Sequence, residues 1–270
     1  MGKPLAGRRV VITRSPADNV SLVDALIPLG AEIIELPLVE VVEPADGGVA
    51  LRAAVDQLDR YRYVVLTSVN GVRAVADALA GRPWPSGVSV VPVGPVTAEW
   101  AADVGMVVGR APSSATVATL VEEFPRWTGA GVCRVLAPLA ELAGDAVTQG
   151  LSDRGYQVDR CEAYRTVAPP AEVTEPGRAL LRDGADAVLF FSPSAVDRFV
   201  DLVAAGSGST GADGPAGIGA EESGSGSVRL AVCIGPSTAA RAARHDRWHV
   251  VVAEPHTEGG VVDALLDRPR

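Results

Sequence analysis

Two pairs of similar segments occur along the chain, and each segment is an apolar run followed by a turn and by residues that can begin a helix. Residues 90–98 read VVPVGPVTA, and residues 231–239 read AVCIGPSTA. Residues 64–72 read VVLTSVNGV, and residues 188–196 read VLFFSPSAV. Apolar runs that end at Gly-Pro or at serine indicate buried strands that lead into helices. The repetition therefore predicts two copies of one α/β design.

Strands and helices are expected to alternate along the whole chain. We expect helices at residues 18–29, 115–124 and about 196–203, and a turn at Pro138. The expected strands are residues 9–13, 31–36, 63–67, 88–93, 106–108, 133–137, 157–163, 187–191, 230–234 and 249–252. Strands that are apolar on both faces belong to parallel sheets with helices on both sides, so two such sheets are the expected fold.

The middle of the chain is expected to form one domain and the two ends together another. Segments rich in proline and charge at residues 37–44 and 164–170 look like linkers. Residues 45–163 then form an inserted α/β domain, and residues 1–36 plus 171–270 form a discontinuous one.

A stretch rich in glycine and serine, residues 204–227, cannot bury much apolar surface and predicts a flexible insertion. Residues 206–211 within it match G-x-G-x-x-G. That pattern binds dinucleotides only between a strand and a helix, and neither is expected here, so nucleotide binding is not indicated.

The composition excludes several classes of protein. Of the 270 residues, 47% are hydrophobic and 21% charged, which is typical of a soluble globular protein with two cores. A net charge of −9 without any cluster of Lys and Arg argues against nucleic-acid binding. We find no signal peptide pattern and no apolar run long enough to cross a bilayer, so a cytoplasmic protein without membrane association is expected. No apolar surface stripe stands out, which favours a monomer.

Neither a metal nor an organic cofactor is expected. Cys133, Cys161 and Cys233 show no C-x-x-C spacing, which argues against disulfides and zinc and favours a reducing compartment. The three histidines lie near the C-terminus without metal-ligand spacing. No P-loop and no H-E-x-x-H motif occurs.

Hydroxyl side chains gather where the expected strands end and the helices begin. They are Ser68, Thr97, Ser192, Ser194, Ser237 and Thr238. Ligands of parallel sheets bind beyond the carboxyl ends of the strands, and helix N-termini favour anions. These side chains could equally serve only as helix caps. The two roles are compatible, and together they predict an anion-binding edge.

Five further residues are candidates for the same edge. Thr13 and Arg14 follow the first strand, and an arginine can hold a carboxylate through two hydrogen bonds, although a plain surface arginine is the alternative. Ser114 and Thr116 begin the expected helix 115–124 and could add another anion site. Tyr164 directly follows the strand 157–163, where its phenol could bind a leaving group or pack on the linker.

Taken in order, these motifs resemble the uroporphyrinogen-III synthase family. The resemblance spans nearly the whole chain except residues 204–227. Its motifs are Thr13-Arg14, the turn at residues 66–72, residues 93–98, 112–123, 163–166, 190–196, 234–239 and 257–266. Each motif alone is weak, but their order and spacing are specific.

The resemblance implies two flavodoxin-like parallel-sheet domains joined by a two-stranded linker, with the active site in the cleft between them. Members convert the linear tetrapyrrole hydroxymethylbilane into uroporphyrinogen III, with loss of water and inversion of the last ring, without metal or cofactor. The resemblance implies that Tyr164 assists departure of the hydroxyl group, and it places Asn70 with the hydroxyl side chains above and Arg14 as binders of the substrate carboxylates. A transient contact with the preceding enzyme of the pathway is also expected.

Two other interpretations remain open at this point. Two α/β lobes with a double crossover also describe non-catalytic binding proteins for small molecules. A nucleotide- or flavin-binding protein would share the fold, although the sequence lacks a phosphate loop in the right place.

Overall fold

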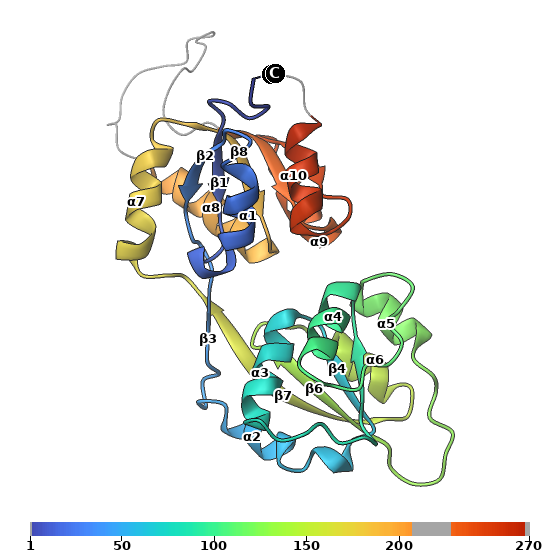
Figure 1. Cartoon of the computed structure of the whole chain (residues 1–270). Helices are drawn as coiled ribbons and strands as arrows, with labels where there is room; N and C mark the ends of the chain where they lie inside the picture. The colour runs from blue at the N-terminus through green and yellow to red at the C-terminus, as the bar shows by residue number, and fades with distance from the viewer. Residues whose placement is uncertain (1, 207–227, 268–270) are drawn as a thin grey trace, which may run out of the picture. The chain divides into compact units, whose positions relative to one another are not determined.

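The computed structural model describes residues 2–206 and 228–267 and divides the chain into two compact units (Figure 1). Unit 1 comprises Met1–Glu40 and Val167–Arg270, and unit 2 comprises Val41–Thr166. The chain passes from one unit to the other between residues 40 and 41 and again between residues 166 and 167. Both crossings fall within the segments that the sequence indicates as linkers.

Unit 1 contains a five-stranded sheet in the order β10-β9-β8-β1-β2. The strands are β1 (Arg9–Ile12), β2 (Glu32–Glu35), β8 (Ala185–Phe190), β9 (Val228–Cys233) and β10 (His249–Val252). All four neighbouring pairs are parallel. Numbered in chain order, the strands follow the sequence 2-1-3-4-5, which is the flavodoxin-like order.

Helices cover both faces of this sheet (Figure 1). On one face, α7 (Ala171–Leu181), α8 (Pro193–Gly206) and α9 (Pro236–Ala242) pack on a core that includes Val188, Phe190 and Phe199. On the other face, α1 (Val20–Leu26) and α10 (Glu258–Leu266) pack on a core that includes Ile12 and Leu189. A short 3-10 helix (η1, Pro16–Asp18) precedes α1.

Unit 2 contains a second five-stranded sheet in the order β3-β7-β6-β4-β5. The strands are β3 (Glu40–Val42), β4 (Tyr63–Leu66), β5 (Ser89–Pro92), β6 (Arg134–Ala140) and β7 (Gln157–Val167). Strands β5, β4, β6 and β7 pair in parallel, and β3 lies beside β7. The neighbouring strands β3 and β7 carry the chain between the units, as a two-stranded linker.

The helices of unit 2 also form two layers. One layer consists of α2 (Val49–Val55), α3 (Val69–Leu79) and α4 (Pro95–Asp103), whose apolar residues join the core around Val64, Leu66 and Leu136. The other consists of α5 (Val117–Glu123) and α6 (Ala146–Ser152), which pack with Val65 and Val135. The short 3-10 helix η2 (Leu58–Arg60) precedes β4.

The repeated sequence segments fall on equivalent elements of the two units. The segments at 64–72 and 188–196 form β4–α3 and β8–α8, and those at 90–98 and 231–239 form β5–α4 and β9–α9. Strands β6 and β7 then correspond to β1 and β2 of unit 1. The position of β10 is taken in unit 2 by Val108, which forms a single parallel bridge with Val90.

Several expected boundaries are wrong. Residues 106–108 form only that one bridge and not a strand. Pro138 lies inside β6 and does not open a turn. A proline is tolerated there because the pairing of β6 with β4 ends before it, so no strand on the β4 side needs the missing N–H. Strand β7 continues to Val167, so Tyr164 lies within a strand and not after it.

Other differences concern helix ends and the insertion. The expected helix 18–29 is divided into η1 and the shorter α1. Helix α8 runs from residue 193 to 206, so residues 204–206 of the expected insertion are helical. Residues 207–227, with the rest of the glycine-rich motif, lie outside the described residues. Among the residues that are described, no helix has the length and apolar character needed to cross a membrane.

Candidate functional site

The carboxyl edge of the sheet in unit 2 brings Ser68 and Tyr164 together. Ser68 Oγ lies 3.0 Å from the phenol oxygen of Tyr164, although the residues are 96 positions apart. Ser68 is also the N-cap of α3, where its Oγ accepts a hydrogen bond of 3.2 Å from the N–H of Gly71. Both side chains are half-buried. Two residues that the sequence indicates for separate roles thus form one hydrogen-bonded pair.

A β-bulge in β7 explains how Tyr164 reaches this position. Leu139 of β6 pairs with Glu162, but Ala140 pairs with Tyr164, so Ala163 is an extra residue in the ladder. Regular strands alternate their side chains between faces, yet both Ala163 and Tyr164 contact the core beneath α3. Bulges re-aim side chains in this way, often beside active sites. The backbone is fixed there because the N–H of Glu141 donates to the Tyr164 carbonyl at 3.0 Å.

The other candidate residues of unit 2 lie at the starts of helices along the same edge. Asn70 is half-buried in the first turn of α3. Thr97 is the third residue of α4 and is buried. Thr116 is exposed and caps α5 by accepting from the N–H of Thr119 at 3.1 Å, and Ser114 is exposed just before it. Ser68 and Thr116 therefore do serve as helix caps. Ser114 makes no cap and is open to solvent.

The candidate residues of unit 1 repeat this arrangement with a different partner. Ser192 Oγ accepts from the N–H of Ala195 at 3.2 Å, as Ser68 does from Gly71, and it lies 3.1 Å from Ser194 Oγ. Ser237 is exposed in the first turn of α9, whereas Thr238 is only 2% exposed. The hydroxyl beside Ser192 thus belongs to Ser194 in the first turn of α8, the helix that Ser192 precedes, whereas the phenol beside Ser68 comes from the separate strand β7.

Thr13 and Arg14 are engaged within unit 1. Thr13 is fully buried, and its hydroxyl donates to the carbonyl of Leu189 at 2.7 Å, which ties β1 to β8. Arg14 forms an ion pair with Glu258 at the start of α10, and its Nε donates to Asn19 Oδ1 at 2.8 Å. Its guanidinium carbon lies 4.2 Å from the ring centre of Phe191. Thr13 thus offers no free hydroxyl, and Arg14 already holds one carboxylate.

Glu258 is a residue that sequence reasoning missed. Burial of its carboxyl acts to raise its pKa, but hydrogen bonds from Ser21 and Arg14 and the charge of Arg14 outweigh this, so the pKa is lowered. The carboxylate is thus kept ionised beside Arg14. No local pattern could have indicated this pair, because its members are 244 positions apart.

The cysteines do not supply a nucleophile. All three are free and buried. Burial raises the pKa of Cys161 and of Cys233 to about 12 and also raises that of Cys133. A thiol with a raised pKa carries almost no thiolate near neutrality, so cysteine-based covalent catalysis has no support here.

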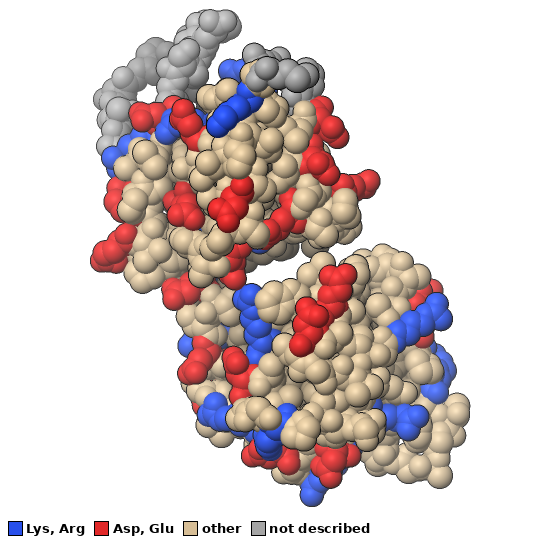
Figure 2. Space-filling model, in the orientation of Figure 1, with Lys and Arg blue, Asp and Glu red and all other residues tan. Residues whose placement is uncertain are grey.

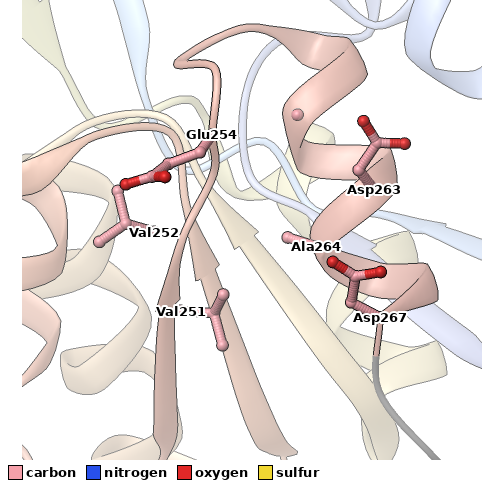
Figure 3. A pocket seen from close by; sticks show the side chains of 7 residues that line it. Val251, Val252, Glu254, Asp263, Ala264 and Asp267 are labelled. Carbon is pink, nitrogen blue, oxygen red and sulfur yellow. The ribbon is translucent and has the colours of Figure 1, made fainter.

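A pocket in unit 1 is lined by none of these candidate residues. It is formed between the edge strand β10 and α10, where Val251 and Ala264 line the gap and Asp263 and Asp267 follow along the helix (Figure 3). Its remaining lining residues are Val252, Glu254 and Gly260. Three carboxylates in its wall would repel a polycarboxylate ligand. In residues 2–206 and 228–267, no group of three or more His, Cys, Asp or Glu side chains is placed to hold a metal ion.

On the visible face, acidic side chains are spread over unit 1 with the basic ones mainly toward its upper end, and unit 2 shows side chains of both signs without a large cluster of Lys and Arg (Figure 2). The net charge of −9 repels an anionic ligand at long range. A polycarboxylate would therefore depend on short-range donors such as helix N-termini and hydroxyl groups.

The sequence and fold were compared with those of known proteins. The model of the family described as "Uroporphyrinogen-III synthase HemD" matches residues 20–263. A uroporphyrinogen-III synthase of Synechococcus elongatus is 28% identical over 76% of this chain and 78% of its own length. The chloroplastic uroporphyrinogen-III synthase of rice, Oryza sativa, is 30% identical over 72% of this chain and 64% of that protein.

A porphyrin biosynthesis protein HemD of Ruminiclostridium josui is 28% identical over 99% of this chain, which spans only 50% of that relative's length. Among solved structures, a mutant uroporphyrinogen III synthase of Thermus thermophilus covers 96% of this chain and 97% of its own, with a TM-score of 0.63 at 18% identity. The enzyme of Helicobacter pylori covers 96% and 98%, with a TM-score of 0.53 at 14% identity. These structures share the fold, and the match of the family model over most of the sequence shows that the chain belongs to the uroporphyrinogen-III synthase family.

Proposed function

We propose that this chain converts hydroxymethylbilane into uroporphyrinogen III. The observation that carries the proposal is the phenol of Tyr164, held 3.0 Å from Ser68 at the carboxyl edge of a parallel sheet in a chain of this family. Ligands of such sheets bind at that edge. A positioned phenol can donate a hydrogen bond to a departing hydroxyl group.

The substrate carboxylates would be bound by helix starts and hydroxyl groups. From unit 2 we propose Asn70, Ser114 and Thr116, with the first backbone N–H groups of α4 near Thr97. From unit 1 we propose Ser192, Ser194 and Ser237, with the backbone beside Thr238. Arg14 would contribute through a guanidinium nitrogen not bonded to Glu258. We leave Thr13 out, because its hydroxyl is already bonded within the core.

The chemistry requires little strong acid. Electrons of the pyrrole nitrogen expel the hydroxyl group, and Tyr164 would stabilise that departure by a hydrogen bond. The substituted carbon of ring D then attacks the carbon that has lost the hydroxyl group, which gives a spiro intermediate. This intermediate fragments and closes again with ring D inverted. Because the free bilane closes unaided to the type I isomer, catalysis consists mainly of holding it in the other orientation.

The test is the isomer composition of the product. Purified protein is mixed with hydroxymethylbilane, and the product is oxidised and resolved into type I and type III porphyrins. We expect type III, formed faster than spontaneous closure. Type I alone, at the spontaneous rate, would contradict the proposal and favour a non-catalytic binding protein for tetrapyrroles or other anions.

Tyr164→Phe is expected to lower kcat roughly ten- to a hundredfold, below the usual range for a lost general acid because the pyrrole nitrogen drives the departure. The phenylalanine ring keeps the packing against the core, so the melting temperature should change little. Tyr63→Phe serves as the matched control, since it removes a phenol whose oxygen accepts from Arg62 at an exposed position. An unchanged kcat in Tyr164→Phe would remove the phenol from the mechanism.

We also propose a cytoplasmic monomer that meets the preceding enzyme of the pathway only transiently. The free, buried cysteines support a reducing compartment. Light scattering on the purified protein would measure the mass, and a dimer would contradict this part of the proposal.

A further inference from the structure

Ser68 lies between the N-terminus of α3 and the phenol of Tyr164, which we propose takes part in the reaction. Its Oγ accepts from Gly71 N–H in the first turn of α3, at 3.2 Å, and lies 3.0 Å from Tyr164 Oη. Helix α3 runs for 11 residues from Val69 to Leu79, so its N-terminal peptide groups carry the positive end of a full helix dipole.

We infer that Ser68 is a positioning residue for Tyr164 and not a direct substrate contact. Ser68 donates its hydroxyl proton to the phenol oxygen, which leaves the phenol's own proton available for the departing hydroxyl group. The inference rests on the proposed function.

The count of donors and acceptors permits this arrangement. A serine hydroxyl has one proton and two lone pairs, and a phenol has one proton and an accepting oxygen. If Tyr164 donated to Ser68, its proton would be used up, and the serine would accept twice at one oxygen. If Ser68 donates, one lone pair takes the Gly71 N–H, the proton goes to Tyr164, and the phenol proton stays free for the substrate.

The three groups then form a chain in which every hydrogen bond points the same way. The Gly71 N–H donates to Ser68, Ser68 donates to Tyr164, and Tyr164 donates to the substrate. Hydrogen bonds arranged head to tail polarise one another. The positive end of the α3 dipole therefore polarises the phenol through the Ser68 hydroxyl. The phenol becomes a better hydrogen-bond donor as negative charge develops on the leaving oxygen.

Both ends of this chain are held by the fold. Ser68 is fixed by its role as N-cap, and Tyr164 is fixed by the bulge at Ala163 and by the hydrogen bond from Glu141 N–H to its carbonyl. The equivalent serine of unit 1, Ser192, contacts Ser194 instead of a tyrosine. The arrangement is thus a specific feature of unit 2 and not a consequence of capping.

The experiment measures kcat and KM for type III product with Ser68→Ala, Ser68→Thr, Tyr164→Phe and the double variant. Thr257→Ala is the matched control, because Thr257 caps α10 with similar backbone angles and accepts from the N–H of Gly260, also a glycine three residues on. Both alanine variants should lose about the same stability, since each removes one N-cap.

We expect Ser68→Ala to lower kcat by roughly tenfold, about 1.4 kcal/mol at the transition state, while KM changes less than about twofold. Ser68→Thr keeps a hydroxyl and should restore most of kcat. In the Tyr164→Phe background, Ser68→Ala should lower kcat no further, because its effect passes through the phenol.

Two results would overturn the inference alone. If Ser68→Ala behaves like Thr257→Ala, the serine is only a cap. If its effect multiplies with that of Tyr164→Phe, or appears in KM, it binds the substrate directly. A wild-type protein that forms no type III product would instead overturn the proposed function, and this inference with it.

Discussion

Asp197 and Arg241 connect α8 to α9 through two hydrogen bonds between their side chains, one of them 2.7 Å long. The hydrogen bond from Arg241 is the main cause of the lowered pKa of Asp197, with smaller contributions from the charges of Arg241, His245 and Arg244. More than a third of each side chain is exposed, so solvent screens the pair. A lowered pKa in the folded state gives stability that is present above the unfolded pKa and is lost as the pH falls through the folded value.

Asp197→Asn is therefore expected to lower the free energy of unfolding by about 0.5 to 1 kcal/mol at pH 7, and by less near pH 3. At the lower pH the wild-type carboxyl approaches protonation and the pair is weakened. Urea unfolding at the two pH values measures the difference. Asp201→Asn, an exposed carboxylate on the same helix, is the control. An equal loss at both pH values would show that the side chain acts through packing and not through charge.

The residues of the site were predictable where local pattern decides their place. Ser68 and Thr116 follow from the rule that hydroxyl residues cap helices, and the structure places both as caps. The contact of Ser68 with Tyr164 was not predictable, because it depends on an extra residue in β7 that no periodicity reveals. The burial of Thr13 and the pairing of Arg14 with Glu258 depend on tertiary contacts in the same way.

Helix α7 contains residues that weaken helices, and its packing explains why one of them is needed. Pro176 and Gly177 both lie in its interior, where they weaken helices. A Cβ at Gly177 would lie 2.3 Å from the carbonyl oxygen of Glu35 and 3.0 Å from Leu36 Cα. The glycine is thus needed because α7 lies directly against the backbone at the end of β2.

Gly177→Ala is expected to destabilise the protein by about 1 to 3 kcal/mol through overpacking. Helix propensity alone predicts the opposite sign, a gain of roughly 1 kcal/mol. Gly87→Ala is the control, because a Cβ there meets no atom within 4 Å. Thermal unfolding of the two variants decides between packing and propensity, and a stabilised Gly177→Ala would contradict the close contact.

Strands were predictable in their existence more than in their length. The bridge at Val108 shows why: Val90 N–H donates to Val107 and Gly109 N–H donates to Val90, and these two bonds complete the pairing. The apolar residues 106–108 look like a strand in sequence, but pairing with β5 stops after one residue. Conversely, β7 grows beyond its apolar part because β3 lies beside it, and this neighbour is not visible in the sequence.

Each unit of the whole molecule has its own cores. The two apolar clusters of unit 2 contain only residues between 51 and 164, and the two clusters of unit 1 contain none of these. The chain enters and leaves unit 2 through the neighbouring strands β3 and β7. A segment of this size with its own core can fold alone.

A fragment of residues 41–166 is expected to fold by itself, with one cooperative transition in urea and a free energy of unfolding of about 5 kcal/mol or more. Trp84, Trp100 and Trp127 report on it by fluorescence. A fragment of residues 41–156 lacks β7, the neighbour of both β3 and β6, and should show no such transition. A gradual change in the longer fragment would contradict the independence of its cores.

The two units contain equivalent elements, but these follow one another in a different order along the chain. In unit 1, α10 and β1 pack in one cluster although they are not consecutive, whereas the matching α5 and β6 of unit 2 are joined through residues 124–133. Phe124, Trp127 and Cys133 of that connection belong to the core, but a break between Trp127 and Cys133 would interrupt no helix or strand. The fold is a cyclic order of elements, and a circular permutant of unit 2 with new ends near Gly129 and Gly131 would keep every strand in its place.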